Sequence, residues 1–371
     1  MKHEKTRIIG ALLVIVLWVL LTAFAWVKPA DDHSVAERRK LTRAPKFTTE
    51  SFVSGQFAKD FEKYTLDQFP LRDSFRQVKS VFSYYALLQS DNNDIYVRDG
   101  YVEKLNYPLD LEAVDSAKKV FTQVYENYVK GKTEHVYVAV VPDKGYYLTQ
   151  ENGFPAMDYD RLMQQMEFPW AEQIDLAHIL SKGSYYRTDT HWRQEELIPV
   201  AQKLAQAMGQ TGPKAENYSV ETMDRPFYGV YYGQAALPMP PDEMKLLQSE
   251  VFQNIKVTGY DDLGRPIELP LYHMEAGDDL YDVFLNGSKQ SLVVLQNPNA
   301  RTDKHLVIFR DSYACSIAPL FLEDYAKVTL VDLRASQTIP MMVNYRDADV
   351  LFLQSTLVLN NADSYRIWGE E

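Results

Sequence analysis

The sequence predicts an α/β protein with a mostly parallel central sheet, preceded by a membrane-spanning helix. Residues 135–141 form a nearly continuous apolar run, which is typical of a strand buried on both faces of a parallel sheet. Similar runs at 305–309, 328–331 and 350–353 alternate with helical stretches, as expected for an α/β core. Residues 8–27 contain no charged side chain and are long enough to cross a bilayer.

Composition limits the classes of partner. The 371 residues carry a formal net charge of −12, which argues against a nucleic-acid partner. Cys315 is the single cysteine, so no intrachain disulfide can form, and we expect it to pack in the core. An exported chain with so few thiols suits a bacterial envelope better than a disulfide-built secreted fold.

The amino-terminal region predicts export. Basic residues in the first seven positions favour a cytoplasmic tail at 1–7, a signal-anchor at 8–27 and a single-pass protein whose body is extracytoplasmic at the cell membrane. Ala-Phe-Ala at 23–25 also fits a cleaved signal peptide, and this alternative stays open. In both cases the body is exported.

We interpret residues 28–50 as a polar linker and residues 51–371 as the extracytoplasmic domain. Aromatic and apolar residues recur at near-helical spacing in 57–69 and again in 75–88. This pattern predicts two amphipathic helices whose apolar faces pack on the main domain.

The remaining elements follow from local patterns. We expect a hairpin at 95–102, helices at 114–128 and 194–208, and a short apolar helix at 316–322. Residues 211–300 are rich in Pro, Gly and Tyr, and we interpret them as an inserted β-rich lobe or long loops beside the active-site mouth.

Two stretches offer the groups for nucleophilic catalysis. A serine hydroxyl needs an adjacent base, and that base needs a third group to orient it. Asp189 and His191 are two residues apart, so in an extended segment both would face one site. Ser312 follows an apolar run where a strand would enter a helix, so free backbone N–H groups, including its own, would favour an oxyanion.

Each stretch also has a structural interpretation. A histidine beside a carboxylate is often only a satisfied polar group, and Asp311 or Ser312 could simply cap the following helix. From the residues alone, both interpretations stay open. The same two stretches supply Trp192, Arg187 and Tyr313 as candidate substrate-binding residues, and Asp143 with Lys144 follows a strand where α/β sheets place ligands.

Both stretches resemble one family. Thr-Asp-Thr-His-Trp at 188–192 is similar to the signature of the DHHW family and of the related AlgJ/AlgX-type alginate O-acetyltransferases, which look like SGNH hydrolases. In that group the Asp and His of the triad precede the Ser, and Asp-Ser-Tyr-Ala at 311–314 occupies the later position. The resemblance also covers 67–73, 141–144 and 282–287, and so most of the chain after residue 35.

The resemblance implies an SGNH hydrolase-like three-layer core, with Asp189 as the orienting group, His191 as the base and Ser312 as the nucleophile. Two positions depart from the pattern. Arg310 stands where the hydrolases and acetyltransferases usually have Gly, and its side chain could narrow the oxyanion pocket. Thr190 replaces the first histidine of the DHHW signature, as it does in the alginate enzymes.

The sequence therefore predicts serine-dependent acyl transfer, most simply of acetyl groups, to or from a polysaccharide or cell-wall glycan. The resemblance implies a membrane-bound acyltransferase as a source of acyl groups. We expect no cofactor and no metal, because CxxC, HExxH, P-loop and GxSxG patterns are absent. The alternative is a glycan-binding or assembly protein that keeps the fold without turnover, and Arg310 is the feature that favours it.

Overall fold

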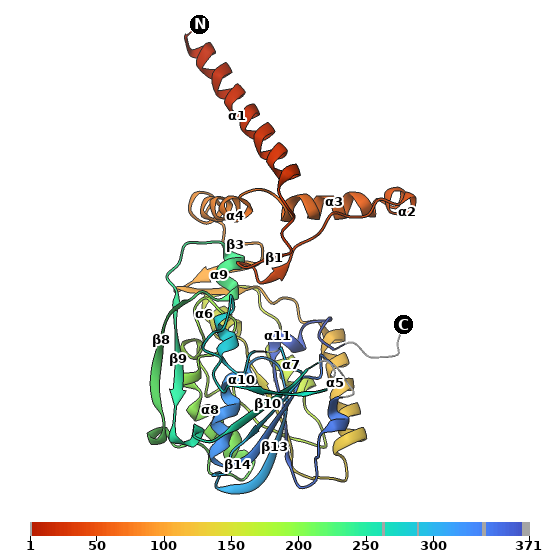
Figure 1. Ribbon diagram of the computed structural model, residues 1–371, viewed down its shortest axis with the longest axis vertical. Helices are drawn as coiled ribbons and strands as arrows, with labels where there is room; N and C mark the ends of the chain where they lie inside the picture. Colours follow the sequence, from red (N-terminus) through yellow and green to blue (C-terminus); the bar gives the residue numbers. More distant parts are fainter. Residues whose placement is uncertain (1, 262–263, 288, 336–338, 366–371) are drawn as a thin grey trace. The chain divides into compact units, whose positions relative to one another are not determined.

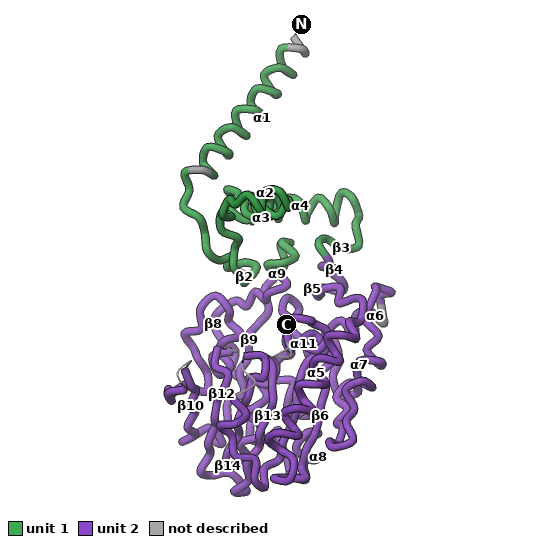
Figure 2. The backbone as a smooth tube through the Cα atoms, turned by 90° about the vertical axis from the view of Figure 1, so that its right-hand side faces the viewer, with its two compact units in different colours: residues 1–93, 232–239 green, residues 94–231, 240–371 purple. Residues whose placement is uncertain are grey.

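The computed structural model describes residues 2–261, 264–287, 289–335 and 339–365. The chain forms two compact units, coloured green and purple in Figure 2. Unit 1 comprises residues 1–93 and 232–239, and unit 2 comprises residues 94–231 and 240–371. The division at residue 93 differs from the domain boundary that we predicted at residue 50.

Unit 1 is largely helical. Its helix α1 (Lys2–Val27) contains the apolar stretch Lys5–Ala25, which is long and apolar enough to cross a membrane, with a mean hydropathy of 2.8. Its other elements include the paired strands β1 (His33–Ser34) and β2 (Arg39–Lys40) and the short strand β3 (Asp91–Asn92). They also include the helices α2 (Thr49–Val53), α3 (Gln56–Asp67) and α4 (Arg72–Val81), the last of which continues as a π-helical turn (Phe82–Ala86).

Residues 28–50, which we predicted as a polar linker, make ion pairs with the helices of unit 1. Glu37 pairs with Arg72 at 2.6 Å and with Arg76 at 3.2 Å. The buried carboxylate of Asp67 accepts hydrogen bonds from the Arg39 guanidinium, which holds the pKa of that carboxyl well below its usual range. These pairs tie the segment to α3 and α4, because buried carboxylates require charged partners.

Unit 2 contains the predicted α/β core (Figure 1). Its eight-stranded sheet has the order β11-β10-β12-β14-β13-β15-β6-β7. The five strands from β14 to β7 pair in parallel, whereas β11, β10 and β12 join antiparallel. Their bounds are β6 (Val136–Val141), β7 (Glu172–Gln173), β10 (Lys256–Tyr260), β11 (Pro266–Leu269), β12 (Leu292–Gln296), β13 (Thr302–Arg310), β14 (Tyr325–Val331) and β15 (Asp349–Ser355).

Alternate residues of the central strands fill two separate apolar cores. In β13, Leu306 and Ile308 belong to one core with residues of α8, whereas Val307 and Phe309 belong to the other with residues of α5. The sheet is therefore covered on both faces, which explains why its strands appear in the sequence as continuous apolar runs. The helices of unit 2 are α5 (Leu111–Val124), α6 (Lys144–Asn152), α7 (Tyr159–Gln165), α8 (Ile198–Ala207), α10 (Ala314–Ile317) and α11 (Thr356–Leu359), while α9 spans Val230–Ala235 at the division between the units.

The segment that we predicted as an inserted β-rich lobe divides in two. The strands β8 (Ser219–Phe227) and β9 (Asp242–Gln248) form a separate antiparallel pair. The strands β10, β11 and β12 instead extend the main sheet, because β12 pairs with β14. The predicted hairpin is present as β4 (Ile95–Arg98) and β5 (Tyr101–Lys104).

Candidate active site

Ser312 lies in the tight turn between β13 and α10, and its side chain is partly exposed. The preceding Asp311 is buried, and its two oxygens have different partners. One accepts the backbone N–H of Tyr313 at 2.9 Å, and the other accepts the backbone N–H of Ser355 at 2.7 Å. Asp311 therefore shapes the turn and ties it to the end of the neighbouring strand β15.

The structure brings the three predicted triad residues together. His191 Nε2 lies 2.7 Å from Ser312 Oγ, and His191 Nδ1 lies 2.6 Å from Asp189 Oδ1. Asp189 is fully buried, whereas the His191 ring keeps a small exposed edge. This order of hydroxyl, imidazole and buried carboxylate has the geometry with which an imidazole accepts a serine proton.

The Asp189–His191 segment is a turn and not the extended segment from which we argued that both side chains face one site. Asp189 Oδ1 also accepts the backbone N–H of His191 at 3.0 Å, and an antiparallel bridge joins Tyr185 to Trp192. The chain therefore bends sharply between these two residues. The carboxylate meets the imidazole because it closes a local turn, and not because alternate side chains of a strand face one way.

Lys144 stabilises this bend through hydrogen bonds to its backbone. Its buried ammonium group donates hydrogen bonds to the carbonyl oxygens of Tyr186 at 2.9 Å, Asp189 at 2.8 Å and Arg187 at 3.3 Å. The buried carboxylate of Glu103 lies 3.7 Å from the same nitrogen. The sequence left open whether Lys144 contacts a ligand or only belongs to a turn, and its contacts hold the backbone that carries the triad.

Three residues that sequence reasoning missed also shape the loop. The Val230 backbone N–H donates to the second oxygen of Asp189 at 2.9 Å. Asp242 accepts hydrogen bonds from the Thr188 backbone at 2.8 Å and from its hydroxyl at 2.6 Å. At Gly229, a Cβ atom would lie 2.3 Å from the Thr188 carbonyl oxygen, so only glycine fits this approach. The signal for Gly229 was its place in a tyrosine-rich turn, which we interpreted only as part of a lobe.

Tyr281 covers one face of the His191 ring. The ring centroids are 3.7 Å apart and the ring planes differ by 8°. The Tyr281 hydroxyl lies 3.0 Å from Ser316 Oγ, which also accepts the indole N–H of Trp192 at 2.9 Å. Burial raises the pKa of Tyr281 well above its ordinary value, so its phenol stays neutral.

The predicted substrate-binding residues occupy different environments. Trp192 and Tyr313 are buried, and they donate hydrogen bonds to the Tyr313 and Thr190 carbonyls respectively, which leaves almost no surface for a substrate. Arg187 keeps a partly exposed side chain and donates to Asp242 and to the Pro241 carbonyl. Of the three, Arg187 is the one whose position allows contact with a ligand.

Arg310 does not point toward the nucleophile. Its buried guanidinium donates to the Gln290 carbonyl at 2.7 Å and to Cys315 Sγ at 3.4 Å, and it lies 3.9 Å from Asp332. Arg310, Asp332 and Cys315 are all buried, and Cys315 belongs to one of the two apolar cores. Because these contacts hold its guanidinium, the Arg310 side chain does not narrow an oxyanion pocket at Ser312. Burial raises the pKa of the Cys315 thiol, which agrees with the packing role predicted for it.

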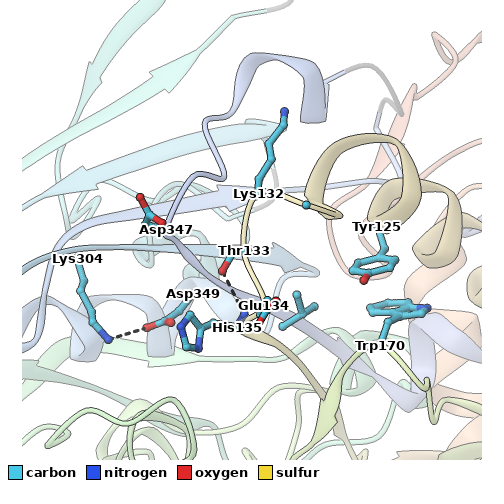
Figure 3. Close-up of a pocket in the computed structure, with 11 residues that line it drawn as sticks. Tyr125, Lys132, Thr133, Glu134, His135, Trp170, Lys304, Asp347 and Asp349 are labelled. Carbon is cyan, nitrogen blue, oxygen red and sulfur yellow. Dashed lines mark hydrogen bonds and ion pairs between the residues drawn. The ribbon is translucent and has the colours of Figure 1, made fainter.

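A cavity of about 760 Å³ lies elsewhere in unit 2, around the amino ends of β6 and β15 (Figure 3). Ser312 follows the carboxyl end of β13, and β13 runs parallel to β15. The cavity and Ser312 therefore lie at opposite ends of the parallel strands. Tyr125 and Trp170 stack on one wall, but the Trp170 ring also packs against Phe168. In the described ranges no group of three or more His, Cys, Asp or Glu side chains is arranged to hold a metal ion.

No family model matches the chain, and no curated protein matches it. Solved structures do. A DHHW family protein from Eubacterium siraeum is 18% identical over 74% of this chain and 94% of its own, with a TM-score of 0.58. PatB1 from Bacillus cereus with a sulfonyl adduct is 18% identical over 75% of this chain and 100% of its own, with a TM-score of 0.57, and a second PatB1 structure is 16% identical with a TM-score of 0.58. The chain therefore has the fold of a DHHW family protein and of PatB1: a mixed α/β fold with a large, mostly parallel sheet.

Proposed function

We propose that this protein is a serine-dependent enzyme that transfers an acyl group, in the simplest case acetyl, to or from an extracytoplasmic glycan. The observation that carries the proposal is the hydrogen-bonded sequence Ser312–His191–Asp189, with contacts of 2.7 Å and 2.6 Å. The fold shared with PatB1 and the motifs at 188–192 and 311–314 support the same class of reaction.

In the first step, Ser312 Oγ attacks the carbonyl carbon of an acyl donor while His191 Nε2 takes the hydroxyl proton. Asp189 holds the imidazole in the required orientation and balances its positive charge. The C–O bond to the leaving alcohol breaks, and that alcohol receives the proton from His191. The product is an acyl ester on Ser312, with the backbone N–H of Ser312 as a proposed oxyanion donor.

In the second step, His191 takes a proton from a sugar hydroxyl or from water, and that oxygen attacks the acyl-serine carbonyl. The Ser312 oxygen leaves and recovers its proton from His191. A sugar acceptor makes the enzyme a transferase, and water makes it an esterase. The acceptor therefore decides which of the two reactions is observed.

The place of the reaction and its partners are part of the proposal. The apolar helix α1 would anchor the protein as a single-pass chain with unit 2 on the extracytoplasmic side, and the basic residues before it favour that orientation. A polysaccharide or cell-wall glycan would be the acceptor. A membrane-bound acyltransferase would deliver acyl groups to Ser312.

Intact-mass measurement of the full chain after incubation with an activated acetyl ester tests the first step. We expect one acetyl adduct that disappears in Ser312→Ala. Cys315→Ala is the matched control, because Cys315 is the one thiol and is buried three residues from Ser312, so its removal should leave the adduct intact. A sulfonyl fluoride provides a second probe of the same hydroxyl, as one similar structure carries a sulfonyl adduct.

Adding glycan oligosaccharides separates the possible reactions. Loss of the adduct in water alone identifies an esterase, and loss only with glycan, together with acetylated product, identifies a transferase. A folded protein that binds glycan without forming any adduct, and that binds equally well as Ser312→Ala, would refute the enzyme proposal and leave a glycan-binding protein.

A further inference from the structure

Helix α4 of unit 1 exposes its apolar side and covers its polar side, which is the opposite of a helix that packs on a protein core. Leu71, Phe75, Val78, Phe82 and Tyr85 follow one another at spacings of three and four residues and form one stripe, here called the apolar face of α4. This stripe is exposed, with Val78 at 68% and Phe82 at 57%. We predicted that these side chains pack in the core, and the structure contradicts that prediction.

The polar side of α4 is the side that the protein covers. Arg76 donates to the backbone carbonyls of Gly233 and Gln234 at 2.9 and 3.1 Å, and it also pairs with Glu37. Burial lowers the pKa of this guanidinium. Ser80 is buried and accepts a hydrogen bond from Asn92 at 2.8 Å. The helix is therefore fixed in an orientation that presents its apolar face outward.

The apolar face of α4 continues onto the candidate membrane span. The Phe75 ring packs edge-on against Phe69 with centroids 5.4 Å apart, and Phe69 lies 6.1 Å from the ring of Trp18 on α1. Residues Thr22 and Ala25 of α1 border a cavity of about 340 Å³ with side chains of α3. One connected apolar surface thus runs from α1 across α3 to α4, all within unit 1.

We infer that the apolar face of α4 lies in the interfacial layer of the lipid bilayer, beside the point where α1 leaves the membrane. A surface continuous with a membrane span shares its environment, and exposed aromatic residues such as Phe82 and Tyr85 are the ones favoured at that depth. Trp18 lies about 10 Å along the α1 axis before Ala25, which matches the depth to which interfacial helices are immersed. The inference depends on α1 being a membrane span and is independent of the chemistry at Ser312.

Depth-dependent quenching in the full chain tests this inference. In a Cys315→Ala background, one cysteine is introduced at Val78 and labelled with an environment-sensitive fluorophore, and the protein is placed in phosphatidylcholine–phosphatidylglycerol vesicles. We expect emission at shorter wavelength, loss of emission with nitroxide-labelled lipids, and protection from iodide in the water. Gln77→Cys is the matched control, since it is exposed, polar and about 100° around the same helix, and we expect iodide to quench it.

A third position separates failure of the inference from failure of its premise. A label at Leu13 on α1 should be quenched by lipid whenever α1 spans the bilayer. Quenching at Leu13 while Val78 stays open to iodide overturns the inference and keeps the span. If Leu13 is not quenched by lipid, the premise fails and the inference falls with it. Protection of Val78 in native membrane vesicles, but not in pure lipid, would assign the face to a membrane-protein partner and also overturn the lipid proposal.

Discussion

The imidazole of His191 lies face to face with the phenol ring of Tyr281, at a centroid distance of 3.7 Å and an interplanar angle of 8°. The stack covers one face of the imidazole and leaves its edge free, and at that edge Nδ1 and Nε2 meet Asp189 and Ser312. Tyr281 thus constrains the orientation of the proposed base.

Tyr281→Leu should therefore slow acylation of Ser312, by up to about 10-fold if a stack worth about 0.5–1.5 kcal/mol is lost. Tyr281→Phe keeps the ring and loses only the hydroxyl contact with Ser316, so its rate should stay close to that of the unchanged protein. Stopped-flow measurement of acylation by an activated ester compares the two. Equal rates in both variants would show that the stacked ring contributes nothing.

Lys144→Met should lower both stability and acylation. The substitution removes the hydrogen bonds to the carbonyls of Tyr186 and Asp189 and leaves the buried Glu103 without its cation. Above pH 8, where the folded protein carries Glu103 as a carboxylate, removing its cationic partner costs about 3–5 kcal/mol, which denaturant unfolding at that pH would measure. The double variant Lys144→Met with Glu103→Gln should regain part of that stability. A double variant less stable than Lys144→Met alone would contradict this pairing.

The raised pKa of the buried Glu103 carboxyl also predicts how the stability of the protein changes with pH. Burial raises its pKa to about 8 from the model-peptide value of 4.5, although the nearby Lys144 opposes the shift. Between pH 4.5 and 8 the unfolded chain has lost this proton while the folded chain keeps it. Its contribution to stability is therefore full below pH 4.5 and falls as pH rises toward 8, by at most about 1.4 kcal/mol per pH unit.

Glu103→Gln removes that titration while keeping the shape of the side chain. The decline of the unfolding free energy between pH 5 and 8 should accordingly be shallower in the variant than in the unchanged protein. Denaturant unfolding at several pH values gives both slopes. Parallel slopes would show that Glu103 titrates normally in the folded state.

Gly229→Ala should destabilise unit 2 by about 1–3 kcal/mol, because the new methyl would overlap the Thr188 carbonyl and Asp189 Cβ, both 2.3 Å from the Cβ position. The displaced Asp189 should also slow Ser312 acylation. Gly277→Ala is the matched control, since nothing lies within 4 Å of its Cβ position. Calorimetry and acylation assays on the two variants test this, and equal behaviour would contradict the close approach.

Arg310→Met should lower stability without abolishing acylation of the folded protein. The substitution leaves Asp332 with one cationic neighbour fewer and exposes the Gln290 carbonyl to an apolar side chain. Thermal unfolding together with acetyl-adduct formation at low temperature measures the two effects separately. A rise in the acylation rate would instead show that Arg310 obstructs the oxyanion pocket, as the sequence alone suggested.

Local patterns predicted the elements well where one periodicity dominates. The apolar runs became β6, β13, β14 and β15, and the spacing of apolar residues at 114–128 became α5. Patterns were less informative where pairing partners are distant. The strands β10 to β12 lie in a Pro- and Gly-rich region, and nothing local indicated that β12 pairs with β14.

At the candidate site, too, the sequence indicated the local features but not the contacts made by distant residues. Residue types and the family resemblance indicated Ser312, His191 and Asp189, but not the bend that joins the last two, nor the support from Lys144, Asp242 and Tyr281. These supporting contacts come from residues between 45 and 90 positions away along the chain. In the local sequence these residues look like ordinary core or capping residues. Their role depends on the fold, which places them beside one loop.

The sequence by itself determined that this protein has an apolar helix long enough to cross a membrane, an α/β core and the three side chains of the proposed triad, because composition and short-range spacing encode hydrophobicity and chemical type. Only the tertiary structure decided that Arg310 points away from Ser312 and that the apolar face of α4 is outermost. The periodicity of a helix reveals that it has an apolar side. Whether that side meets a core or another environment depends on where distant partners such as Glu37 and Gly233 bind its polar side.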